Sequence, residues 1–93
     1  MDKISEVSNP ELVLKQLKKY YGGDVDLYLS SSKHKKYMIF NEDGKKVHFG
    51  SILYQDYTKH KNKKRRENFR NRNKRWADAD MYTPAHLSYY LLW

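Results

Sequence analysis

Seventeen consecutive residues, 59–75, carry the whole positive excess of this 93-residue chain. The segment contains ten basic residues and one acidic residue, Glu67, for a net charge of +9; the rest of the chain has nine basic and ten acidic residues, for a net charge of −1. A segment with this much charge cannot be buried, so the core has to come from the residues on either side of it. The charge also makes the segment the expected contact with an oppositely charged partner.

The residues before this basic segment predict a helix and then a sheet. Residues 9–23 begin with Asn9 as a helix cap and Pro10 in the first turn, and they end at Gly22. Residues 25–49 predict three antiparallel strands, because "VDLYL" alternates apolar and polar residues and "NEDGKK" contains the turn pair Asp43-Gly44. Gly50 is expected to end the sheet.

The second half of the chain predicts two further helices. Residues 50–76 read as a junction followed by a basic helix from about Lys61 to Trp76, and residues 82–93 read as a short C-terminal helix capped by Thr83. The expected fold is therefore α+β, with residues 1–93 forming a single domain. The expected core combines a helix stripe, one sheet face and the C-terminal end: Leu12, Leu17, Tyr20, Val25, Leu27, Leu29, Ile39, Val47 and Leu91–Trp93.

Several classes of protein are disfavoured by what the sequence lacks. There is no cysteine for disulfides or thiolate metal sites, the N-terminal residues do not look like a secretory signal, and "YYLLW" is far too short to span a membrane. His48, Asp56 and His60 fall within thirteen residues, as in some metal-dependent nucleases, but no second carboxylate or phosphate loop accompanies them. We predict no enzymatic activity, no metal or other cofactor, and no small-molecule substrate.

The basic segment leaves three interpretations open. Dense Lys and Arg with Phe69 and Trp76 nearby suit contacts to nucleic-acid phosphates and bases. The same arginines suit bidentate contacts to carboxylates on an acidic protein. A solvated helix face with no partner is the third interpretation.

A resemblance favours the second interpretation. The segments "VHFG", "DYTKH", the pair Arg65-Arg66, "RNKRW" and the closing "YYLLW" follow one another in residues 36–93. In this order they resemble a family of small proteins of large double-stranded DNA viruses (giant viruses related to mimivirus and the chloroviruses) and of some phages. Relatives in that family carry Asp and His where this chain has Asn62 and Asn73.

The resemblance implies a viral protein, made in the host cytoplasm or nucleus and located in the virion. We expect a minor capsid protein that cements neighbouring major or minor capsid proteins by contacting their acidic surfaces; a protein that binds or packages the genome is the alternative. The residues expected to contact the partner are Tyr57, Lys59, Lys61, Lys63, Lys64, Arg65, Arg66, Phe69, Arg70, Arg72, Lys74, Arg75 and Trp76.

Overall fold

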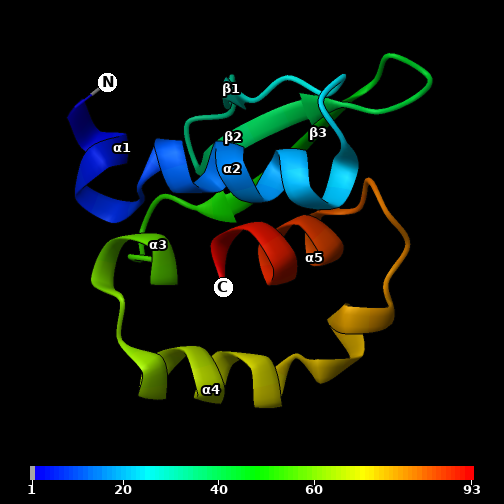
Figure 1. The fold of residues 1–93 in the computed structure, drawn as a ribbon. Helices are drawn as coiled ribbons and strands as arrows, with labels where there is room; N and C mark the ends of the chain where they lie inside the picture. Colours follow the sequence, from blue (N-terminus) through cyan, green and yellow to red (C-terminus); the bar gives the residue numbers. More distant parts are fainter. Residues whose placement is uncertain (1) are drawn as a thin grey trace.

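The computed structural model describes residues 2–93, which form an α+β fold as predicted. A three-stranded sheet follows the N-terminal helices in sequence, and the longer of these helices packs beside the C-terminal helical segment on one side of the sheet (Figure 1). Within these residues, no helix combines the length and the apolar character that a membrane crossing requires. In chain order the elements are α1 (Asp2–Val7), α2 (Pro10–Tyr21), β1 (Tyr28–Leu29), β2 (Lys35–Phe40), β3 (Lys46–Ser51), α3 (Tyr57–His60), α4 (Lys63–Arg72), the 3-10 helix η1 (Lys74–Asp78), α5 (Pro84–Leu87) and the π-helix η2 (Ser88–Leu92).

The sheet has the order β1-β2-β3, and both pairs of strands are antiparallel. The predicted hairpin joins β2 to β3: Gly44 has a φ of 78°, and the side-chain oxygen of Asn41 accepts hydrogen bonds of 2.9 Å from the backbone N–H groups of Asp43 and Lys45. The first strand is shorter than predicted, covering only residues 28–29 of the expected 25–29. Val25 and Leu27 instead pack against the core from an irregular segment, because burying a side chain does not require strand pairing.

Helix α2 begins and ends as its sequence predicts. The side chain of Asn9 accepts hydrogen bonds from the backbone N–H groups of Glu11 and Leu12, and the N–H of Gly22 closes the last turn on the carbonyl of Lys18. The buried side of the helix agrees with only part of the expected apolar stripe. Val13 and Leu17 are fully buried, whereas Leu12 is half-buried and Tyr20 is 37% exposed.

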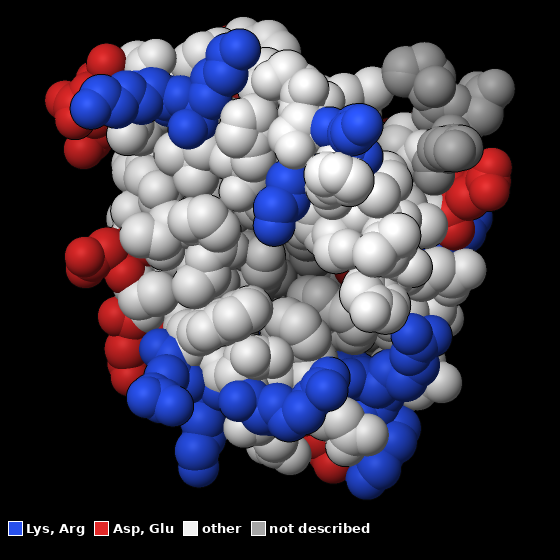
Figure 2. Space-filling view, turned by 180° about the vertical axis from the view of Figure 1, so that it is seen from behind, with Lys and Arg blue, Asp and Glu red and all other residues white. Residues whose placement is uncertain are grey.

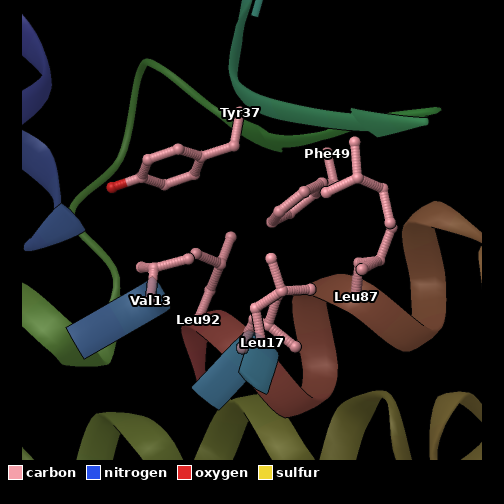
Figure 3. Close-up of a cluster of buried hydrophobic side chains, with 8 residues drawn as sticks. Val13, Leu17, Tyr37, Phe49, Leu87 and Leu92 are labelled. Atoms are coloured by element: carbon pink, nitrogen blue, oxygen red, sulfur yellow. The ribbon is translucent and has the colours of Figure 1, made fainter. Parts of the chain in front are cut away.

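The core forms where α2 and the C-terminal segment pack against one face of the sheet (Figure 3). Tyr37 and Phe49, directly opposite each other on β2 and β3, are its largest side chains, although neither was among the predicted core residues. Leu29, which was predicted to be buried, is 42% exposed. The buried apolar residues are Val13, Leu17, Tyr37, Ile39, Phe49, Leu87, Leu91 and Leu92.

Gly50 lies inside β3 and does not end it, since the strand continues to Ser51. Its φ is 81°, and a Cβ at this position would lie 2.8 Å from Cδ1 of Leu92 and 3.2 Å from Cδ of Lys36. The residue is therefore required both by the backbone and by the close approach of two side chains. It lets the C-terminal segment lie directly on the end of the sheet.

Two helices differ from the prediction in their extent. The basic helix α4 covers residues 63–72 and not 61–76, because Asn73 has a φ of −116° and its side-chain N–H₂ donates to the carbonyl of Phe69. The chain then continues as η1, which contains Trp76. At the C-terminal helix the predicted cap is present, as Thr83 Oγ1 accepts from the N–H of His86, but the helix changes to a π-helix after Leu87.

Candidate partner-binding groove

A buried polar cluster fixes one side of the candidate site. Lys36 Nζ lies 3.1 Å from Oδ2 of Asp56, and the two side chains are 3% and 0% exposed. The hydroxyl of Thr58 donates to the other carboxylate oxygen of Asp56, and it also accepts a 2.9 Å hydrogen bond from the N–H of Asn9. The "DYTKH" segment is thereby tied to β2 and to the start of α2.

The backbone and two hydroxyls complete this cluster. The N–H of Asp56 donates to the carbonyl of Val7 at 3.0 Å, and the carbonyl of Asp56 accepts from the N–H groups of Lys59 and His60 at the start of α3. Ser8 Oγ lies 3.2 Å from the Thr58 hydroxyl and accepts a 2.8 Å hydrogen bond from the hydroxyl of Tyr37. Burial lowers the pKa of Lys36, and the charge of Asp56 opposes that shift.

Helix α4 forms the other side of the site and is attached by the inner side chains of the basic segment. Arg66 Nε donates a 2.6 Å hydrogen bond to the carbonyl oxygen of Trp93, and its guanidinium lies 4.9 Å from the centre of the Tyr57 ring. Phe69 stacks on Trp93 with ring centres 4.3 Å apart, and the Arg70 guanidinium lies 4.8 Å from the Tyr89 ring. No residue of α4 is fully buried.

Between these two sides lies a groove of about 1240 Å³. In the view from behind, the surface is hollowed near its middle, and a band of Lys and Arg side chains runs below the hollow along the edge that α4 occupies (Figure 2). We call this feature the basic groove. Its lining residues are Lys35, Lys36, Gly50, Ser51, Tyr54, Gln55, Arg65, Asn68, Phe69, Asn71, Arg72, Trp76, Thr83, Pro84, Ala85, Ser88, Leu92 and Trp93.

The basic groove combines cations, amides and aromatic rings and is lined by no acidic side chain of the part of the chain that the structure describes. Arg65 and Arg72 lie on its α4 side and Lys35 on the β2 side. Among residues 4–93, no hydrogen bond or ion pair engages the side chains of Arg65, Asn68 or Arg72. These groups are exposed and available to a ligand.

The structure divides the predicted contact residues into three groups. Arg65, Phe69, Arg72 and Trp76 line the basic groove. Tyr57, Arg66 and Arg70 turn toward the protein's own rings and backbone and hold α4 in place. The remaining six residues are exposed outside the groove: Lys59, Lys61, Lys63, Lys64, Lys74 and Arg75.

The histidines and the carboxylate considered for a nuclease site have separate roles. Nδ1 of His48 lies 2.7 Å from the hydroxyl of Ser30, while Nδ1 of His60 accepts a 2.9 Å hydrogen bond from the N–H of Asn62. Burial lowers the pKa of His60, and the charge of Arg65 lowers it further. In the described part of the chain, no three His, Cys, Asp or Glu side chains are placed to hold a metal ion.

The lining of the groove also includes residues that were not predicted from the sequence as contacts, among them Lys35, Tyr54, Gln55 and Trp93. Tyr54 follows a strand and is 65% exposed, and an exposed aromatic beside a basic segment is a signal that could have been noticed. Trp93 lies about twenty residues from α4 in the sequence, so only the folded structure reveals that it forms the floor beneath Phe69.

Residues 25–73 match the model of a family described as "Family of unknown function (DUF5754)". The match covers more than half of the chain, so the chain belongs to this family. It includes the sheet, α3 and α4, and therefore both sides of the basic groove. No curated protein and no solved structure matches the chain significantly.

Proposed function

We propose that this family member is a non-enzymatic, minor structural protein of a large DNA virus that cements capsid proteins by binding their acidic surfaces. The observation that carries the proposal is that the arginines of the basic segment have two different roles. Two arginines, Arg66 and Arg70, hold α4 against the body, and they leave Arg65, Arg72 and the outer lysines presented on a fixed scaffold. A helix fixed in this way can contact a partner without first having to be ordered.

The viral and virion parts of the proposal are supported by the resemblance of residues 36–93 to small proteins of giant viruses. A cementing role is supported by the wide distribution of the exposed positive charge. Exposed cations occur in α3, around α4 and in η1, so several neighbours can be contacted at once. Individual exposed ion pairs contribute roughly 0–1 kcal/mol, so the proposed contact depends on their number together with the groove.

The absence of enzymatic activity is supported by the roles of the polar residues. Both carboxylate oxygens of Asp56 are engaged inside the protein, and the carboxylate is 0% exposed. The Lys36–Asp56 pair is thus accounted for as part of the fold, and a reacting group would have to reach the substrate.

Carbodiimide crosslinking of purified virus particles tests the proposal, because this reagent joins a lysine amine directly to a carboxylate. Crosslinks should run from Lys59, Lys61, Lys63, Lys64 and Lys74 to Asp and Glu of other virion proteins, and they should survive treatment with nuclease. Lys15, Lys18 and Lys19 of α2 are the internal control and should give few. The proposal fails if mass spectrometry does not find the protein in the particles.

Nucleic-acid binding is the second candidate, and one observation favours it. Tyr54 and Trp76 are exposed, at 65% and 36%, in a groove bordered by cations, and bases stack on such rings. This function predicts binding to oligonucleotides that weakens steeply with salt, by about 0.7–0.9 log units per tenfold increase for each phosphate neutralised. Oligonucleotide titrations at three salt concentrations measure that slope. No binding at low salt excludes the candidate.

A further inference from the structure

One strip of α4 has an ordered arrangement of chemical groups along the basic groove. Arg65, Asn68, Phe69 and Arg72 follow the spacing i, i+3, i+4 and i+7, which places them on one side of the helix. The two arginines stand at the ends of the strip, and the amide and the aromatic ring lie between them. Phe69 is half-buried, because Trp93 covers one face of its ring and the ring of Trp76 packs against its edge, with ring centres 5.8 Å apart.

The ends of the strip carry charge, whereas its middle holds an uncharged amide and an aromatic ring. The Cα atoms of Arg65 and Arg72 are about 10.5 Å apart along the axis, from seven residues at 1.5 Å each. The apolar lining of the groove includes Phe69, Leu92 and Trp93, and the rings of Phe69 and Trp93 are stacked. A ligand that matches this strip has an apolar group between two anionic groups.

From this pattern we infer that the basic groove binds an extended acidic segment of a partner protein, with two carboxylates four residues apart and an aromatic or large aliphatic side chain midway between them. The inference rests on the proposed function and specifies what is bound. The carboxylates meet Arg65 and Arg72, and the middle side chain lies on Phe69 and Trp76.

The spacing follows from the geometry of an extended chain. Successive residues rise about 3.3 Å and their side chains alternate between two faces, so positions i, i+2 and i+4 share a face and span about 13 Å. Positions i and i+3 are closer to the distance between the arginines, but their side chains point to opposite faces. The span from position i to position i+4 is about 3 Å longer than the distance between the Cα atoms of Arg65 and Arg72, and the flexible Arg side chains can bridge this difference.

The polar groups of the groove suit a peptide backbone as well. The amide of Asn68 lies in the strip and that of Asn71 also lines the groove, and both can exchange hydrogen bonds with the N–H and C=O groups of an extended chain. Lys35, on the opposite side, is within the lining and can meet a side chain on the other face of the segment. Arg at the two end positions matches carboxylates, because its planar fork makes two parallel hydrogen bonds.

A peptide agrees with this pattern better than a nucleic-acid strand does. A strand carries a phosphate at every nucleotide, whereas the α4 side of the groove has no cation between Arg65 and Arg72. Most of the lysines that would follow a phosphate backbone lie outside the groove. A volume of about 1240 Å³ also exceeds the 300–1,000 Å³ that is usual for small-molecule pockets, as expected for a groove that receives a chain segment.

Fluorescence anisotropy with labelled nine-residue peptides tests the inference on the full chain. The probe has the central sequence Asp-Ser-Phe-Ser-Glu between Gly and Ser residues. The matched peptides move the second acid to i+3, replace Phe by Ser, or replace both acids by their amides. A single-stranded oligonucleotide of nine thymidines is the probe of the other class.

Two charge-matched double variants complete the design. Arg65→Gln with Arg72→Gln removes two charges inside the groove, and Lys63→Gln with Lys74→Gln removes two charges outside it. We expect the groove variant to bind the probe about ten- to a hundredfold more weakly for each arginine removed, because a hydrogen bond between charged groups contributes about that much to affinity. The outer variant should weaken it less than about threefold, as exposed charges contribute little.

The outcomes separate this inference from the proposed function. The inference is supported if the groove variant alone loses peptide binding and if the i+3, Ser and amide peptides bind more weakly than the probe. Equal loss in both double variants overturns it and leaves general binding to acidic surfaces standing. Binding of the oligonucleotide but not of the peptide overturns both. Circular dichroism of each variant confirms that a loss of binding is not a loss of fold.

Discussion

The two sides of the basic groove are held in place in different ways. The side formed by β3 and the "DYTKH" segment is fixed by a core of fully buried apolar side chains and by the enclosed Lys36–Asp56 pair. The α4 side has no fully buried residue and is attached through the rings of Phe69 and Trp93 and through two arginines. A segment with a net charge of +9 cannot be buried, so its own cations serve as its attachments.

The two sides therefore differ in their contribution to the stability of the fold and in how far their side chains are exposed to a partner. Substitutions of the buried side chains on the first side should destabilise the whole chain, because these residues belong to the core or to the enclosed Lys36–Asp56 pair. Substitutions on the α4 side should loosen the helix and leave the rest folded. Three changes test this comparison, in order of decreasing expected effect.

Lys36→Met should cost about 3–5 kcal/mol of unfolding free energy, because it leaves the Asp56 carboxylate buried without its cation. Urea denaturation followed by circular dichroism measures the loss. Lys35→Met is the matched control, because Lys35 is exposed and its replacement should change stability little. Adding Asp56→Asn to Lys36→Met should recover part of the loss by removing the buried charge. A loss below about 1 kcal/mol for Lys36→Met would contradict the importance of the pair.

Phe69→Ala should cost roughly 1–2 kcal/mol, because it removes a half-buried ring and its stacking on Trp93. The effect should be local. Hydrogen exchange should show faster exchange of the amides of α4, while the amides of β2 and β3 keep their protection. Tyr54→Ala, which removes an exposed ring on the opposite side, serves as the control. Uniform acceleration over both regions would mean that α4 and the sheet unfold together.

Acidification should have the smallest effect. Burial lowers the pKa of His86, whose Nδ1 lies 2.7 Å from the hydroxyl of Tyr21, and that hydroxyl in turn accepts from the N–H of Tyr82. Because the unfolded chain binds the proton more tightly, the contribution of His86 is complete above its unfolded pKa of about 6.5 and is lost as the pH falls toward its lower folded pKa. The pKa of His60 is lowered in the same sense.

Thermal unfolding at pH 7.5 and pH 5.5 measures this effect. The stability of the wild type should fall between the two, and the fall should be smaller in His86→Gln, which cannot take up the proton. If the variant shows the same fall as the wild type, His86 is not among the groups responsible.

Local signals in the sequence were sufficient for the ends of several elements. Asn9 with Pro10, the Asp43-Gly44 turn and the Thr83 cap act over three or four residues, so they can be identified without knowing the fold. The shorter basic helix could also have been anticipated, since Asn73 can bond to the backbone and so favours a helix end.

The contacts that build the groove act over long distances and could not be predicted in this way. Lys36 stands in a run of polar residues and would be expected at the surface, but the strand alternation directs it toward Asp56, twenty residues later. Arg66 and Arg70 are indistinguishable in the sequence from Arg65 and Arg72. Only their positions relative to Trp93 and Tyr89 separate arginines that hold the fold from those that face the groove.

The attachment of α4 through Tyr89 and Trp93 also has a consequence for the order of events on the ribosome. These residues are translated after the helix that they hold. At about 5–20 residues per second, the twenty-one residues from Arg72 to Trp93 take roughly one to four seconds to add. During that interval the most highly charged part of the nascent chain lacks the rings on which it packs, so the groove can form only after Trp93 has been added.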